Sequence, residues 1–190
     1  MITIRIPQDR IGVVIGPHGA TRKALQERSG LPVHVDSDAN EVSFDDKAEG
    51  ADPLMVLKMR DVLRALGRGF SPEHAMRLFS DDAYFELLDI HDYAGKNKAR
   101  VRQVTARLIG SEGKTRRIIE EQTRCDLAIY GHTVGIIGEL EDLPERVLDT
   151  VHAQVASGVR WVKVVGDWAY GDEIRLNYDP ALLREVADRL

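Results

Sequence analysis

The chain of 190 residues has almost no cysteine and no long apolar run. Cys125 stands alone, so an internal disulfide is impossible, and we expect a buried, unreactive thiol in a reducing, cytoplasmic compartment. No apolar run approaches the roughly 20 residues that a membrane helix needs. The alternating N-terminus also lacks the architecture of a signal peptide. These absences predict a protein with no membrane partner.

The sequence also lacks the usual marks of a catalytic, nucleotide or metal site. A phosphate-binding P-loop needs a glycine five residues before its Gly-Lys-Thr, and Leu108 stands there. The six histidines lack metal-ligand spacing. His91 and Asp92, as neighbours on an expected strand, would point to opposite faces. We expect no enzyme, no cofactor and no metal; a nucleotide hydrolase dependent on Lys114 stays open as an alternative.

What the sequence does contain is one module twice. The motif Ile-Gly-x-x-Gly-x-Thr-Arg stands at residues 15–22 and again, 94 residues later, at residues 109–116. Two glycines at this spacing let the backbone approach another molecule closely, and at the start of a helix that molecule is usually anionic. A bare Gly-x-x-Gly is common by chance, but two matched copies in the same context are informative.

Both copies predict the order strand, helix, helix, strand, strand, helix. We divide the chain into a first module at 1–67, a linker at 68–83, a second module at 84–158 and an extension of unknown role at 159–190. Ser71 before Pro72 predicts a short, docked linker helix. In the helix from Pro53 we expect a buried stripe of Leu54, Leu57, Val62, Leu63 and Leu66. The expected elements are 2–6, 8–15, 20–28, 31–35, 41–44 and a helix from 53, then 84–90, 98–108, 114–123, 126–130, 133–137 and 144–156.

Charge is distributed unevenly along the chain. The net charge is −5, yet residues 96–117 contain eight basic side chains against Glu112 alone. This basic block surrounds the second glycine loop, whereas an acidic segment at 36–52 lies near the first. The distribution favours a binding site for a polyanion at the second copy, and a solvated helix face is the plain alternative.

Together these features predict two loops whose main-chain amides contact the phosphates of single-stranded RNA, as a KH domain does with about four nucleotides. We expect the second copy to dominate, because Pro17 removes one amide donor from the first. Two alternatives are a duplicated fold that has lost its ligand and an adaptor that docks proteins. The candidate RNA-binding residues are Ile109, Gly110, Ser111, Glu112, Gly113, Lys114, Arg116, Arg117, Lys98, Arg100 and Arg107, with Ile15, Gly16, Pro17, His18, Gly19, Arg22 and Lys23.

The sequence resembles the archaeal and eukaryotic small-subunit ribosome biogenesis factors of the partner-of-Nob and Krr type. The stretches at 108–123 and 128–138 are most similar, followed by 65–73 and 92–97, and the resemblance covers roughly residues 1–158. It implies an α+β fold of two tandem type I KH domains, each a three-stranded antiparallel sheet with helices on one face. It also implies RNA binding without catalysis near the 3′ end of small-subunit rRNA. The implied protein partners are the endonuclease that matures this end and, in archaea, the alpha subunit of translation initiation factor two.

Overall fold

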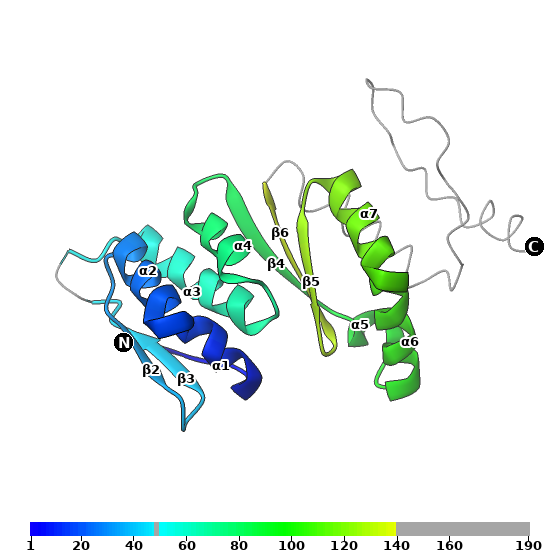
Figure 1. Ribbon diagram of the computed structural model, residues 1–190, viewed down its shortest axis with the longest axis horizontal. Helices are drawn as coiled ribbons and strands as arrows, with labels where there is room; N and C mark the ends of the chain where they lie inside the picture. Colours follow the sequence, from blue (N-terminus) through cyan, green and yellow to red (C-terminus); the bar gives the residue numbers. More distant parts are fainter. Residues whose placement is uncertain (48–49, 140–190) are drawn as a thin grey trace, which may run out of the picture.

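A computed structural model of the chain describes residues 1–47 and 50–139 (Figure 1). The expected closing helix at 144–156, the end of the second module and the extension at 159–190 lie outside the described residues.

The first module has the predicted order of elements. Its three strands form an antiparallel sheet in the order β1-β3-β2, so the first strand pairs with the last. The helix after β1 ends at Gly16, and the next helix ends at Gly30, as the sequence predicts. The elements are β1 (Ile2–Arg5), α1 (Gln8–Ile15), α2 (Ala20–Ser29), β2 (Val33–Asp36), β3 (Glu41–Phe44) and α3 (Pro53–Gly67).

The linker and the second module follow with the same topology. Ser71 caps the linker helix, because its side-chain oxygen accepts a hydrogen bond from the His74 N–H. The second sheet has the order β4-β6-β5, equivalent to that of the first. The expected α+β class with two three-stranded antiparallel sheets is confirmed. The elements are α4 (Pro72–Met76), β4 (Ala83–Asp89), α5 (His91–Ala94), α6 (Lys98–Ile109), α7 (Lys114–Thr123), β5 (Asp126–Tyr130) and β6 (Thr133–Glu139).

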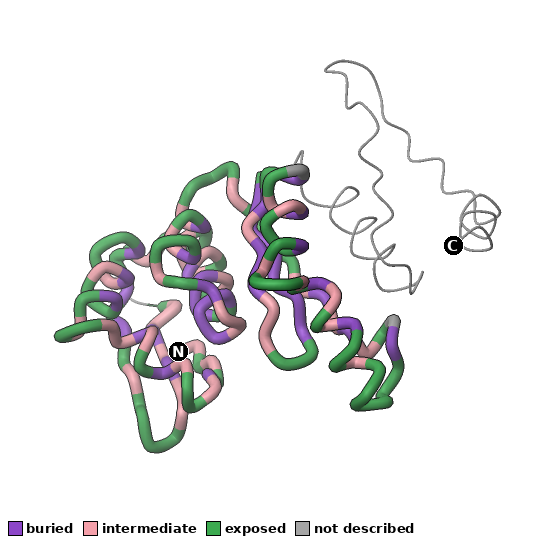
Figure 2. Tube along the Cα trace, turned by 45° about the vertical axis from the view of Figure 1, so that its right-hand side comes forward, coloured by how far each residue is buried: buried purple, intermediate pink, exposed green. Residues whose placement is uncertain are grey.

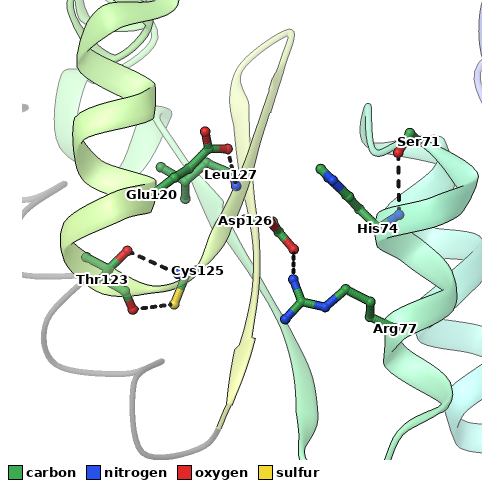
Figure 3. Close-up of polar contacts among 8 residues, drawn as sticks. All are labelled: Ser71, His74, Arg77, Glu120, Thr123, Cys125, Asp126 and Leu127. Atoms are coloured by element: carbon green, nitrogen blue, oxygen red, sulfur yellow. Dashed lines mark hydrogen bonds and ion pairs between the residues drawn. The ribbon is translucent and has the colours of Figure 1, made fainter.

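The duplication extends to individual hydrogen bonds. The hydroxyls of Ser29 and Thr123 each donate to the carbonyl four residues earlier, at 2.7 Å in both copies. The side-chain oxygens of Gln26 and Glu120 each accept the main-chain N–H seven residues later, at 3.4 and 2.9 Å. Figure 3 shows the Glu120 contact to β5 beside the turn at Thr123. Each pair is 94 residues apart, so the repeat specifies the same connection from helix to strand twice.

Two expectations about particular residues are wrong. Leu54 and Leu57 are 46% and 50% exposed, whereas Val56 between them packs against the core and Met59 is buried, so the two leucines lie on the outer side of α3. The strand expected to continue to residue 90 ends at Asp89, and His91 begins the short helix α5. His91 and Asp92 are therefore not strand neighbours on opposite faces.

The second sheet is covered on both faces. On β5 and β6, Leu127 and Ile136 belong to the core beneath α6 and α7, whereas Ala128 and Ile137 belong to the core of the first module and linker. Successive strand residues point to opposite faces, which explains this alternation. Figure 1 shows the sheet between α4 on one side and α6 and α7 on the other, and buried positions line its strands in Figure 2.

The linker packs against this second face through an aromatic contact. Phe70 is 2% exposed and meets Phe85 of β4 edge to face, with ring centroids 6.3 Å apart and planes at 81°. A Cβ on Gly135 would lie 2.8 Å from the Phe70 ring, so this glycine makes room for it. The linker therefore docks, as its capping signal predicts.

Polar contacts complete the interface between the modules. Arg77, directly after α4, pairs with Asp126 at the start of β5 (Figure 3). The Tyr130 hydroxyl donates to the Asp9 carboxylate of α1 at 2.7 Å, and this hydrogen bond raises the pKa of Tyr130. A phenol whose pKa is raised stays protonated at neutral pH, so this contact persists under ordinary conditions.

The structure also bears on the expectations about membrane helices and about Cys125. Within 1–47 and 50–139 no helix is both long and apolar enough to cross a membrane. The Cys125 thiol is buried, as expected, and its sulfur lies 3.3 Å from the Thr123 carbonyl oxygen (Figure 3).

Candidate nucleic-acid interface

The two glycine loops have the same backbone conformation. The first glycines, Gly16 and Gly110, have φ values of 73° and 72°. The third positions, His18 and Glu112, adopt left-handed φ values of 51° and 52°, which non-glycine residues seldom do. Because a histidine and a glutamate adopt the same uncommon geometry, the fold sets the loop shape rather than the side chains inside it.

The two glycines of each loop are required for different structural reasons. A Cβ on Gly110 would lie 2.2 Å from the Thr115 hydroxyl oxygen and 2.7 Å from the Thr115 nitrogen, and Gly16 has the same clash with Thr21. A Cβ on Gly113 would meet no atom within 4 Å. The first glycine therefore holds the loop against the helix that follows it. The second glycine has a positive φ of 74° and open space around it, so its backbone stays accessible.

This difference predicts opposite outcomes for two alanine substitutions. Gly110→Ala forces a shift of the Thr115 backbone, and we expect it to lower the free energy of unfolding by about 2–3 kcal/mol. Gly113→Ala has room and should cost only about 1 kcal/mol for its positive φ. Urea unfolding followed by circular dichroism measures both. Equal losses in the two variants would contradict the assignment.

The helix after each loop begins without a side-chain cap. Gly113 precedes α7 and Gly19 precedes α2, and neither helix start has a side-chain hydrogen bond to its free N–H groups. The first N–H groups of a helix have no partner within the helix, and the helix dipole adds partial positive charge there. A phosphate oxygen is the ligand that such a start binds well.

The basic side chains beyond the second loop differ in how they are held. The Arg117 guanidinium donates to the Glu112 carbonyl oxygen at 2.9 Å, which keeps this charge beside the loop. Arg116 pairs with Glu120 at 3.5 Å. Lys114 is exposed and has no ion pair with any residue that the structure describes. Lys114 and Arg117 are therefore the cations best placed to meet a phosphate at this loop.

The basic residues of α6 lie on two flanks rather than on one track. Arg100 and Arg107 are seven residues apart, which places them on the same side of the helix. Lys98 lies two residues before Arg100, a rotation of about 200°, so its side chain leaves from a different side. Arg100 and Arg107 can together extend a basic surface from the loop, and Lys98 belongs to the other flank.

An apolar edge accompanies the second loop. Ile109 is 38% exposed, although it is a large aliphatic side chain directly before the loop. Its counterpart Ile15 is half-buried. Leu108, the residue before Ile109 in α6, is buried in the core. An exposed aliphatic surface beside uncapped amides suits a ligand that has both phosphates and flat bases.

The first loop has the same backbone shape as the second loop but fewer basic side chains beside it. Pro17 stands at its second position and removes one amide donor, and Ala20 occupies the place equivalent to Lys114. Arg22 is exposed, and Lys23 pairs with Glu27 at 3.6 Å on the helix surface.

Sequence reasoning missed two groups of residues. Thr21 and Thr115 fill the space left by the first glycines, and their place in the repeat could have indicated this. Asp89, His91 and His132 come together in the second module, with ligand-capable atoms within 4.8 Å of one another. Because His132 lies 41 residues after His91, no local spacing could have indicated this cluster.

Comparison with known proteins agrees with the fold. A family model described as a eukaryotic-type KH domain, KH-domain type I, matches residues 84–157, and a KH domain model matches residues 1–49. The crystal structure of Dim2p from Pyrococcus horikoshii OT3 is 36% identical, with a TM-score of 0.74 over 82% of this chain and 90% of that one. This chain belongs to the Dim2 family of tandem KH-domain proteins.

Two further proteins similar to this chain extend the comparison. The aDim2p chain in a crystal structure of an a/eIF2alpha-aDim2p-rRNA complex from Pyrococcus horikoshii OT3 is 31% identical, with a TM-score of 0.75 over 99% of this chain and 92% of that one. A KH domain-containing protein of Methanocaldococcus jannaschii is 43% identical over 138 residues, or 73% of this chain. That match spans 60% of the length of the relative. The expected resemblance to a tandem KH family is thus confirmed.

Proposed function

We propose that the chain binds single-stranded RNA through its two glycine loops, and that the second loop is the primary site. The second loop supports this most directly, because the open space at Gly113 leaves its backbone accessible at the point where the basic side chains gather. The uncapped start of α7, Lys114, the positioned Arg117 and the exposed Ile109 surround the same point. The first loop adds a weaker contact through Gly16, Gly19 and Arg22.

We also propose that the RNA is the 3′ region of small-subunit rRNA during ribosome biogenesis, in the cytoplasm. The archaeal relative in the a/eIF2alpha-aDim2p-rRNA complex supports both a ribosomal RNA and a/eIF2alpha as partners of this chain. The endonuclease that matures the rRNA 3′ end is the third partner in the proposal. The chain itself contributes positioning and no catalysis.

The salt dependence of binding tests the primary site. If Lys114, Arg116, Arg117 and one α6 arginine each neutralise a phosphate, log K should fall with log salt at a slope of about −3. Lys114→Ala gives the second copy the residue that the first has at Ala20, and should make the slope shallower by about 0.7. Fluorescence anisotropy with a labelled oligonucleotide measures both slopes. A wild-type slope near zero would rule out the assignment.

A protein-docking adaptor is the second candidate, and the exposed Leu54 and Leu57 of α3 favour it. Crosslinking to cellular RNA followed by sequencing separates the two functions. RNA binding predicts enrichment of the 3′ region of small-subunit rRNA that is lost in Gly113→Asp. An adaptor without RNA contacts predicts no enrichment with either protein.

A further inference from the structure

Three side chains that the proposed RNA interface does not use come together at one end of the second sheet. Asp89 is the last residue of β4, His91 begins α5 and His132 lies in the turn between β5 and β6. The backbone holds these segments together, because the Ile90 N–H donates to the His132 carbonyl oxygen at 2.8 Å and Asp89 is paired with Thr133. The cluster is therefore built from the end of β4, the start of α5 and a tight turn that the backbone holds together.

The distances within the cluster suit a shared ion. The His91 Nδ1 atom lies 2.9 Å from one Asp89 carboxylate oxygen, and the His132 Nε2 atom lies 3.7 Å from the other. The two imidazole rings have centroids 4.4 Å apart and planes at 38°. Tetrahedral Zn²⁺ with bonds of about 2.0–2.1 Å needs ligand atoms about 3.3 Å apart. All the ligand-capable atoms lie within 4.8 Å of one another, so ion binding would have to draw the most distant pair together by up to about 1.5 Å.

The chemistry of the three groups is also suitable. Two imidazoles and one carboxylate form a ligand set that Zn²⁺ takes in proteins, with a fourth position left for water or another ligand. An aspartate carboxylate is ionised at neutral pH and so carries the negative charge that a cation site needs.

The cluster is accessible without being fully solvated. The Asp89, His91 and His132 side chains are 42%, 35% and 46% exposed, so an ion can reach them without any opening of the fold. The Asp89 carboxylate also accepts the His91 N–H at 2.8 Å, which is an ordinary role at the start of a helix. The start of the helix explains the contact between Asp89 and His91, but it does not explain why His132 lies beside them.

We propose that Asp89, His91 and His132 bind one Zn²⁺ ion at the end of the second sheet. The ion would link β4, α5 and the β5–β6 turn. Because residues 95–97 alone separate α5 from α6, it would also fix the start of the basic helix. The proposal is independent of RNA binding, since none of the three residues belongs to the glycine loops.

The test is a Zn²⁺ titration of the full chain, free of any histidine tag and stripped of metal by a chelator. Competition with a chromophoric chelator gives the stoichiometry and affinity. We expect one Zn²⁺ per chain, with affinity falling by at least about 100-fold in His132→Ala and in His91→Ala. His34→Ala removes an exposed histidine of the first module and serves as the matched control, with unchanged affinity expected.

A second measurement guards against misfolded variants. Zn²⁺ should raise the melting temperature of the wild type and of His34→Ala, and should leave His132→Ala unchanged. His132 lies exposed in a two-residue turn, so its replacement should preserve the circular dichroism spectrum. Wild-type affinity in a folded His132→Ala or His91→Ala would overturn the proposal and indicate adventitious binding elsewhere. So would the absence of stoichiometric binding in the wild type.

Discussion

Gly113→Asp should abolish measurable binding of short RNA while leaving the protein folded. The new carboxylate would project into the space that Gly113 leaves open, beside the uncapped start of α7. Repulsion from a phosphate at close range and the loss of main-chain contacts together should cost about 2–4 kcal/mol of binding free energy, a loss of roughly 30-fold or more. Aspartate tolerates the left-handed region better than most residues, so little stability should be lost.

The first copy provides the matched control. Gly19 has a φ of 78° against 74° at Gly113, and a Cβ there also meets no atom within 4 Å. Gly19→Asp therefore has the same local cost, yet it acts at a loop with Pro17 and no equivalent of Lys114. We expect a loss of affinity well below that of Gly113→Asp, measured by anisotropy on the same oligonucleotide. Equal losses would show that the two loops contribute equally to RNA binding. Unchanged affinity in Gly113→Asp would contradict the assignment of the second loop as the primary site.

Phe70→Ala should destabilise the protein by about 3–5 kcal/mol, because truncation of a buried aromatic leaves a cavity that the surroundings only partly fill. The cavity would lie between the linker and the second sheet, where Phe70 meets Phe85 and covers Gly135. We therefore expect the two modules to lose their fixed relation and the 68–83 linker to become sensitive to protease. Urea unfolding and limited proteolysis measure the two effects.

Tyr84→Ala is the control for this substitution, since Tyr84 is an aromatic residue of β4 that is 44% exposed. Its truncation should change stability by no more than about 0.5 kcal/mol. If Phe70→Ala unfolds at the same urea concentration as Tyr84→Ala, the aromatic contact does not hold the modules together.

The two substitutions also separate two properties of RNA binding. Gly113→Asp removes the contact within one loop, whereas Phe70→Ala changes how the two loops are positioned relative to one another. A short oligonucleotide that fills only the second loop should bind Phe70→Ala nearly as well as the wild type. A longer RNA that spans both loops should bind it more weakly, because linked contacts lose their advantage when their spacing is no longer fixed.

The sequence predicted the elements well because their signals are local. The alternation at residues 2–6, the cap at Ser71 and the glycine at each helix end depend on neighbours within a few residues. The 94-residue repeat then required both copies to share one topology. The errors arose where local pattern and tertiary packing differ. The sequence assigns Leu54 and Leu57 to an apolar stripe, yet Val56 and Met59 occupy the core-facing side of the first turns of α3 and leave both leucines exposed.

The sequence by itself determined the duplicated α+β module, the two glycine loops and the unequal charge around them, because each depends on residues close together in the chain. Only the tertiary structure decided that the second sheet is buried on both faces. It also decided that a side chain at Gly110 would clash with Thr115, whereas one at Gly113 would not. It further decided that Asp89, His91 and His132 lie close together. These outcomes depend on distances between residues that folding brings together, and neither the spacing nor the composition of a sequence records such distances.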